Sequence, residues 1–135
     1  MAARAHDLST WQRIRMVLVL GSLTALGPLT IDTYLPAFPA IAEHLEATES
    51  AVQLTLTGTL IGIAVGQLLV GPLSDAFGRR RPLIAAVSLH VMVSVLCALA
   101  PNVVLLGALR VLQGMAAAAG AVIAMAVVRD LFAGV

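Results

Sequence analysis

The chain has little charge, a single cysteine and no lysine. Only 11% of its 135 residues are charged, whereas 60% are hydrophobic, and the mean hydropathy is +1.00. A soluble domain of this size would need polar side chains to cover its core, so this composition excludes an ordinary soluble fold. Cys97 alone cannot form a disulfide framework within the chain, and no cluster of residues has zinc-ligand spacing. We therefore expect neither a metal site nor a cofactor.

Long apolar runs take up most of the sequence and predict an all-α membrane protein. Four runs can cross a hydrocarbon core of about 30 Å at about 1.5 Å per residue, and we predict transmembrane helices at residues 16–35, 52–73, 83–100 and 103–128. We expect Gly27-Pro28 to kink the first helix, Pro36 and Pro39 to end it, and Gly71-Pro72 to end the second. The first run is too long for the apolar region of a secretory signal, so it is predicted to be a membrane anchor.

The arginines lie on one side of these predicted helices. Three precede the first helix, three lie between the second and third, and one follows the fourth, which accounts for seven of the eight. The opposite connections contain Glu43, Glu46 and Glu49 or, at Pro101-Asn102, no charge. Because cytoplasmic loops of membrane proteins are enriched in basic residues, we predict that both termini and the arginine-rich turn are cytoplasmic.

Small residues recur at every fourth position in two of the predicted helices. The second contains Gly58, Gly62 and Gly66, and the fourth contains Gly114 and Ala118. Such stripes allow helix backbones to approach closely. We therefore interpret them as packing surfaces rather than ligand sites.

Two ionisable residues lie inside predicted spans, where a charge costs about 2.5–3.5 kcal/mol on insertion scales. Asp32 is expected about 6 Å from the outer edge of the membrane and Arg110 about 11 Å, so a direct or water-bridged pair is geometrically possible. Asp32 is either a proton or cation site facing a cavity or a carboxylate at a helix end. Arg110 is either a cavity residue or a structural bridge to neighbouring backbone.

Further polar residues lie close to Arg110 or in a neighbouring span. Gln113 and Gly114 follow Arg110 by three and four residues, so the three share a helix face and form a candidate cavity wall. His90 lies in the middle of the third span. We expect it to be a neutral histidine packed between helices.

The stretch GPLSDAFGRRRP, residues 71–82, joins the second and third spans. Asp75 precedes Arg79 by four residues, so the two can pair across a helical turn. Gly78 permits a backbone bend that a side chain would obstruct, and Pro82 suits the first turn of a helix. These residues alone leave open whether the turn is more than an anchor at the cytoplasmic face.

This stretch resembles Gly-x-Leu-x-Asp-x-x-Gly-Arg-Arg-x-Pro, the signature between the second and third helices of the major facilitator superfamily. The segment IDTYLPAFPAI, residues 31–41, is similar to drug:proton antiporters of the bicyclomycin and chloramphenicol resistance (Bcr/CflA) branch. The segment LRVLQG, residues 109–114, resembles the Arg-x-x-Gln-Gly motif of proton-coupled members. The resemblance covers nearly the whole chain from about residue 20. It implies that residues 1–135 form the first third of a twelve-helix transporter.

The resemblance also implies a function and a set of site residues. The parent protein would export drugs or other small molecules in exchange for protons across a bacterial cytoplasmic membrane. Its partners would be drug-like substrates, protons, lipid and the remaining transporter helices, and not nucleic acid. The implied coupling residues are Asp32, Arg110, Gln113 and Gly114. The implied cytoplasmic latch, which would contact the other half of the transporter, consists of Gly71, Asp75, Gly78, Arg79 and Arg80.

Because four helices are too few for such a transporter, we expect this chain to be a fragment. Two alternatives remain: a stand-alone four-helix multidrug exporter that works as a homodimer, and a non-transporting membrane segment that associates through its glycine stripes. An enzyme is not expected, since the sequence contains no phosphate loop, metal cluster or Ser-His-Asp arrangement.

Overall fold

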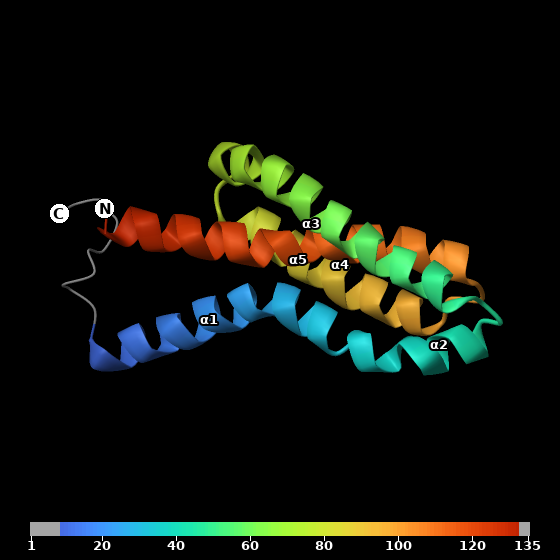
Figure 1. Ribbon diagram of the computed structural model, residues 1–135. Helices are drawn as coiled ribbons and strands as arrows, with labels where there is room; N and C mark the ends of the chain where they lie inside the picture. The colour runs from blue at the N-terminus through green and yellow to red at the C-terminus, as the bar shows by residue number, and fades with distance from the viewer. Residues whose placement is uncertain (1–8, 133–135) are drawn as a thin grey trace.

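The computed structural model describes residues 9–132, which form helices and no strands (Figure 1). The elements are α1 (Thr10–Asp32), the short 3-10 helix η2 (Leu35–Ala37), α2 (Phe38–His44), α3 (Glu49–Phe77), α4 (Arg80–Ala98) and α5 (Val103–Phe132). Four helical segments are long and apolar enough to cross a membrane, namely Thr10–His44, Glu49–Phe77, Arg80–Ala98 and Val103–Asp130. The prediction of four membrane helices is therefore confirmed.

Polar side chains cap the first turns of three helices. The hydroxyl of Ser9 accepts a hydrogen bond from the backbone of Gln12, whose side chain in turn accepts one from the backbone of Ser9. Thr48 caps α3 through the backbone N–H of Ala51, and Asn102 Oδ1 accepts from the backbone N–H of Leu105 at 2.8 Å. These bonds satisfy backbone donors that a helix start leaves unpaired, and they fix where each helix begins.

Two prolines lie inside helices rather than at their ends. Pro28 is within α1, which Figure 1 shows bending partway along its length. The prediction that Gly71-Pro72 ends the second span was wrong, because α3 continues past Pro72 to Phe77. A proline removes one backbone hydrogen bond and bends a long helix whose other bonds remain intact. The helix ends instead at Gly78, where φ is 76° and ψ is 158°.

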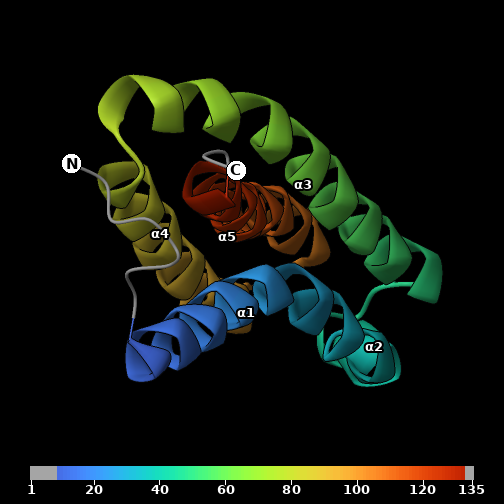
Figure 2. The same cartoon turned by 90° about the vertical axis from the view of Figure 1, so that its left-hand side faces the viewer.

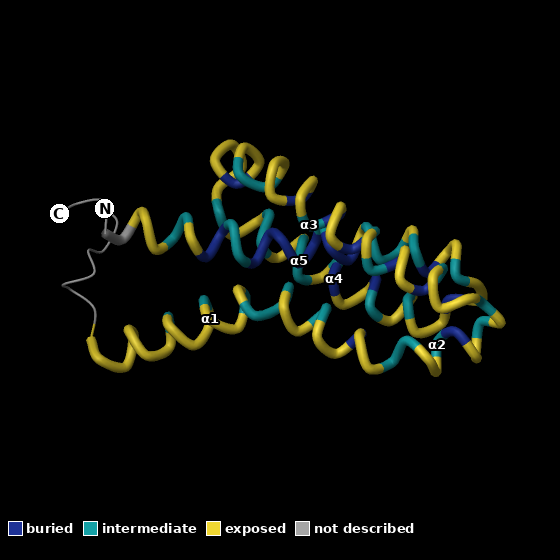
Figure 3. Tube along the Cα trace, in the orientation of Figure 1, coloured by how far each residue is buried: buried dark blue, intermediate teal, exposed yellow. Residues whose placement is uncertain are grey.

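Helix α5 occupies the centre of the bundle. It packs against α1, α3 and α4, and Figure 2 shows these three helices arranged around it. The buried residues concentrate along α5 (Figure 3), including the run Ala116–Ala119 and Ile123. By contrast, α1 contains no buried residue. The outward faces of the four long helices carry large exposed apolar side chains, as expected where a helix meets lipid or another membrane helix.

Glycines allow α3 and α5 to touch backbone to backbone. A Cβ atom on Gly62 would collide with the carbonyl oxygen of Val111, and one on Gly66 would lie 2.6 Å from the carbonyl oxygen of Met115. On the facing helix, a Cβ atom on Gly114 would collide with the backbone of Thr59. These contacts confirm the predicted packing role of the glycine stripe in α3.

The two ends of the bundle differ in net charge, although Asp75 and Asp130 lie at the arginine-rich end. The start of α1, the α3–α4 junction and the end of α5 lie at one end (Figure 1), and α2 and the loop to α3 lie at the other. Apart from Arg110, the arginines within residues 9–132 lie at the first end: Arg13, Arg15, Arg79, Arg80, Arg81 and Arg129. The second end carries Glu43, Glu46 and Glu49. Arg4 lies outside the described residues.

Candidate functional site

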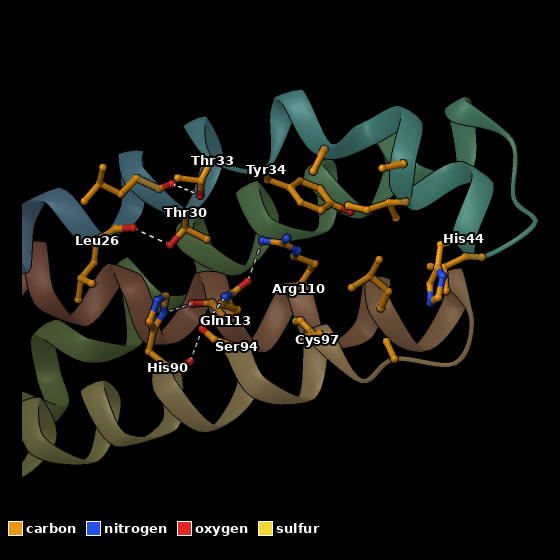
Figure 4. Close-up of a pocket in the computed structure, with 18 residues that line it drawn as sticks. Leu26, Thr30, Thr33, Tyr34, His44, His90, Ser94, Cys97, Arg110 and Gln113 are labelled. Atoms are coloured by element: carbon orange, nitrogen blue, oxygen red, sulfur yellow. Dashed lines mark hydrogen bonds between the residues drawn. The ribbon is translucent and has the colours of Figure 1, made fainter.

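A pocket of about 900 Å³ lies between α4, α5 and the first helical segment, Thr10–His44, which comprises α1, η2 and α2 (Figure 4). Most of its wall is apolar, with Leu26, Leu29, Ile41 and Leu106 among the lining residues. Its polar lining residues include Thr30, Thr33 and Tyr34 from the first segment, His90 and Ser94 from α4, and Arg110 and Gln113 from α5. Among the described lining residues there is no carboxylate. The pocket is therefore a largely apolar space beside one fixed cation.

Arg110 is held in the pocket by two neighbours. Its Nη1 atom donates a hydrogen bond of 2.9 Å to Gln113 Oε1, and its guanidinium carbon lies 3.5 Å from the centroid of the Tyr34 ring. The Nε atom is buried and has no hydrogen-bond partner among the described residues. A guanidinium over an aromatic face is attracted by the ring quadrupole, more strongly where water is excluded. This contact helps to explain how α5 holds a charge inside an apolar span.

Tyr34 connects Arg110 to two other elements and was missed by the sequence reasoning. It is 4% exposed, and its hydroxyl lies 2.5 Å from Thr55 Oγ1 on α3. Because the Thr55 hydroxyl donates to the backbone carbonyl of Val52 at 2.6 Å, the Tyr34 hydroxyl acts as the donor between the two. Its ring also packs edge-to-face against Phe38, with the centroids 5.0 Å apart. A signal was available, since Tyr34 is the single tyrosine of the chain and follows Asp32 by two residues.

A second set of polar contacts joins α5 to α4. Gln113 Nε2 donates to Ser94 Oγ at 2.8 Å, and Ser94 Oγ donates to the carbonyl oxygen of His90 at 2.7 Å. The Nδ1 atom of His90 lies 3.3 Å from the carbonyl oxygen of Gln113. His90 is 9% exposed, so its predicted position between packed helices is confirmed. Ser94 was not singled out in the sequence, because one hydroxyl in an apolar helix gives no pattern.

The structure does not bring Asp32 to Arg110. Asp32 is exposed at the last turn of α1, it does not line the pocket, and it forms no ion pair with Arg110. The sequence argument compared only depths along the membrane normal. The pocket is instead lined by Thr30 and Thr33, and successive helical residues are rotated by about 100°, so Asp32 lies on another side of α1.

Gly114 is also placed elsewhere than the sequence suggested. Arg110 and Gln113 line the pocket, but Gly114 is buried against the backbone of Thr59 and Ile63 on α3. At about 100° per residue, Gln113 and Gly114 diverge from Arg110 in opposite rotational directions. The three residues therefore do not share one environment: Gln113 faces the pocket with Arg110, whereas Gly114 faces the contact with α3.

The arginine-rich turn contains a small ion-pair network centred on Arg79. Arg79 Nη1 lies 3.2 Å from Asp75 Oδ1, which confirms the predicted pair, and Arg79 Nε donates to Asp130 Oδ2 at 2.9 Å. Arg79 Nη1 also donates to Ser74 Oγ at 3.1 Å. The network thus ties the α3–α4 junction to the end of α5. The sequence reasoning did not find Asp130, because its partner is 51 residues away.

The other predicted latch residues differ in their structural support. Gly78 has the positive φ of 76° that favours glycine, as predicted. A Cβ atom on Gly71 would meet nothing within 4 Å, and the Gly71 carbonyl accepts a bond from Ser74 Oγ at 2.9 Å. Arg80 is exposed and forms no ion pair within residues 9–132. A latch role for all three stays a prediction.

Comparison with known proteins agrees with this architecture. The sequence profile of the Major Facilitator Superfamily matches residues 18–134. The chain is 50% identical over 129 residues to YdgK of Bacillus subtilis (strain 168), an uncharacterized MFS-type transporter, covering 96% of this chain and 32% of that protein. It is 43% identical over 118 residues to a chloramphenicol resistance protein of Pseudomonas aeruginosa, covering 87% and 28%. It is 39% identical over 116 residues to a bicyclomycin resistance protein homolog of Haemophilus influenzae, covering 86% and 29%.

No solved structure matches the chain at a significant level. The chain spans about a third or less of the length of these curated relatives. The profile match nevertheless covers most of the chain and includes both the pocket and the arginine-rich turn. This chain is therefore a membrane protein of the major facilitator superfamily, in the branch of its bicyclomycin and chloramphenicol resistance relatives.

Proposed function

We propose that this chain supplies the first four membrane helices of a drug exporter in a bacterial cytoplasmic membrane, driven by protons that move inward. The observation that supports the proposal most directly is the pocket beside Arg110. Its volume of about 900 Å³ is in the range that holds a drug-sized molecule. An apolar wall with a few fixed polar groups is typical of sites that bind varied small molecules.

The proposed substrate site contains one cluster around a fixed cation, which consists of Arg110, Tyr34 and Gln113. The guanidinium is fixed on one side by the Tyr34 ring and on another by the Gln113 amide. It can donate hydrogen bonds to a substrate, whereas it cannot accept them. Chloramphenicol is a suitable first probe because a relative is named for resistance to it.

We propose Asp32 as the proton carrier. It follows the pocket-lining residue Thr30 by two positions and directly precedes Thr33, so it lies close to the site without being part of its wall. A carboxylate there can take up a proton from one side and release it to the other when the two halves of a transporter rock around the site. The proposal does not require a permanent pair between Asp32 and Arg110.

The Arg79 network is proposed as the cytoplasmic latch. It joins three helix ends through Asp75, Arg79 and Asp130, so a movement of α3 or α5 must stretch one of its bonds. In the intact transporter these three helix ends would contact the other half and stabilise a conformation that is open to one side of the membrane. Because Arg79 is partly buried while both carboxylates are exposed, we expect the latch to affect switching more than stability.

The test uses the complete reading frame that encodes this chain, expressed in bacteria and assayed in inverted membrane vesicles. An acidic vesicle interior should drive chloramphenicol uptake, and Asp32→Asn should abolish that uptake. Glu43→Gln is the matched control, because Glu43 is an exposed carboxylate outside the pocket lining and should leave uptake unchanged.

Three results would count against parts of the proposal. Uptake in Asp32→Asn equal to that of the wild type would contradict the proton role of Asp32. Absence of uptake in the wild type, over a panel of neutral and cationic drugs and with the protein verified in the membrane, would contradict drug export. Uptake by residues 1–135 expressed alone would favour a stand-alone four-helix exporter.

A further inference from the structure

A chain of hydrogen bonds runs from Arg110 through Gln113 and Ser94 to the backbone of α4. Each bond in it has a fixed donor and acceptor, and this order sets the position of Arg110. An arginine side chain can only donate hydrogen bonds, so the oxygen of the Gln113 amide must face it. The amide nitrogen of Gln113 then points the other way, toward Ser94 Oγ at 2.8 Å. The Ser94 hydroxyl gives its own hydrogen to the carbonyl of His90, which leaves its oxygen free to accept from Gln113.

Each hydrogen bond in this chain allows only one assignment of donor and acceptor. If the amide of Gln113 were flipped, its nitrogen would face a guanidinium and its oxygen would face a hydroxyl that already donates elsewhere. The series ends on the backbone of α4, which is a rigid support, and a contact between His90 Nδ1 and the Gln113 carbonyl fastens the two helices at the same level. Figure 4 shows these side chains converging on the pocket wall.

We infer that Ser94 is a positioning residue for Arg110: through Gln113 it holds the guanidinium against the Tyr34 ring and inside the pocket. This inference rests on the proposed function, because it assigns Ser94 a part in the same substrate site. Ser94 lines the pocket and lies on α4, whose other lining residues are His90, Cys97 and Ala98. Without the hydroxyl, Gln113 loses the acceptor that orients its amide, and the guanidinium is free to leave the ring.

The first experiment measures the kcat/KM of drug uptake for variants of the complete reading frame. Ser94→Ala should lower it by about two- to twelve-fold, which is the effect of one net hydrogen bond. Ser94→Thr keeps the hydroxyl and should restore most of the loss. Ser88→Ala is the control, because Ser88 is an exposed serine of the same helix outside the pocket.

The decisive variant is the double substitution of Ser94→Ala and Gln113→Ala. If Ser94 acts through Gln113, the double variant should be no worse than Gln113→Ala alone. A merely structural contribution of Ser94 to helix packing would instead add to the loss. Additive losses, or Ser94→Ala activity equal to that of the wild type, would overturn the inference.

A second readout separates this inference from the proposed function. Cys97 lines the same pocket one helical turn beyond Ser94, and its reaction with a small water-soluble maleimide reports access to the pocket without any transport. The rate should change several-fold in Ser94→Ala, and it should be equal in Gln113→Ala and in the double variant, with Cys97→Ser identifying the labelled site. An unchanged rate in Ser94→Ala would overturn the inference, whereas absence of drug uptake in the wild type would contradict only the proposed function.

Discussion

A guanidinium inside a membrane helix needs neighbours that compensate for the loss of water, and Arg110 has two of them on different elements. The Tyr34 ring lies 3.5 Å from the guanidinium carbon, and Gln113 accepts a hydrogen bond of 2.9 Å. Tyr34 is itself fixed by Thr55 on α3. At the scale of single residues, the pocket is therefore organised by an aromatic ring and an amide rather than by an opposite charge.

Substitutions at Tyr34 should separate the hydroxyl from the ring. Tyr34→Phe removes the bond to Thr55 but keeps the ring under Arg110, so we expect a loss of about 1 kcal/mol in unfolding free energy. Tyr34→Leu also removes the cation–π contact, which adds about 0.5–2 kcal/mol to the loss. Thermal unfolding of the purified proteins in detergent measures both. Equal losses in the two variants would show that the ring contributes nothing to stability.

At the scale of helices, the fold depends on how closely α3 can approach α5. Gly62 and Gly66 of α3 face the backbone of Val111 and Met115, and Gly114 of α5 faces α3 in return. Because lipid is as apolar as a leucine side chain, van der Waals packing, interhelical hydrogen bonds and lipid entropy drive helix association in a bilayer, and small residues allow the close approach that packing needs. The central position of α5 follows from this, because its small residues allow neighbours on several sides.

Adding a methyl group at this contact should push the two helices apart. Gly62→Ala places a Cβ atom against the backbone of Val111, and backbone cannot move aside as a side chain can, so we expect a loss of about 1–3 kcal/mol. Gly21→Ala is the control, because a Cβ atom there meets nothing within 4 Å, and alanine favours a helix over glycine by up to about 1 kcal/mol. Thermal unfolding should therefore give opposite shifts. A Gly62→Ala variant as stable as the wild type would contradict the close packing.

At the scale of the whole molecule, the bundle has a basic end and an acidic end. Arg13, Arg79 and Arg129 come from three separate parts of the sequence, yet they lie at the same end because the helices run back and forth. The opposite end contains Glu43 and Glu49. Basic residues are retained on the cytoplasmic side during insertion. The charge difference therefore supports the predicted orientation, in which the arginine-rich end is cytoplasmic.

Cysteine labelling tests that orientation directly. In a Cys97→Ser background, a membrane-impermeant maleimide should label Glu43→Cys on intact cells and Arg81→Cys only after the cells are permeabilised. Both positions are exposed, so a difference in labelling reports the side of the membrane and not burial. The reverse pattern would contradict the orientation inferred from the arginines.

Several features were predictable from residues close together in the chain. Hydropathy was enough for the four membrane helices, and a spacing of four residues was enough for the pair of Asp75 and Arg79. Gly78 could be identified because a reversal between two helices often needs a positive φ. These properties depend on local composition and on the pitch of one helix, so a linear sequence contains them.

Other features depended on how the helices turn toward one another. Asp32 lies at a depth that would suit a pair with Arg110, but it is rotated away from the pocket, and Gly114 is turned to α3 instead of lining the pocket. Asp130 reaches Arg79, and Ser94 reaches Gln113, only after α3, α4 and α5 have packed. The rotation of a helix about its axis is set by its contacts with its neighbours, and those contacts form only when the bundle assembles.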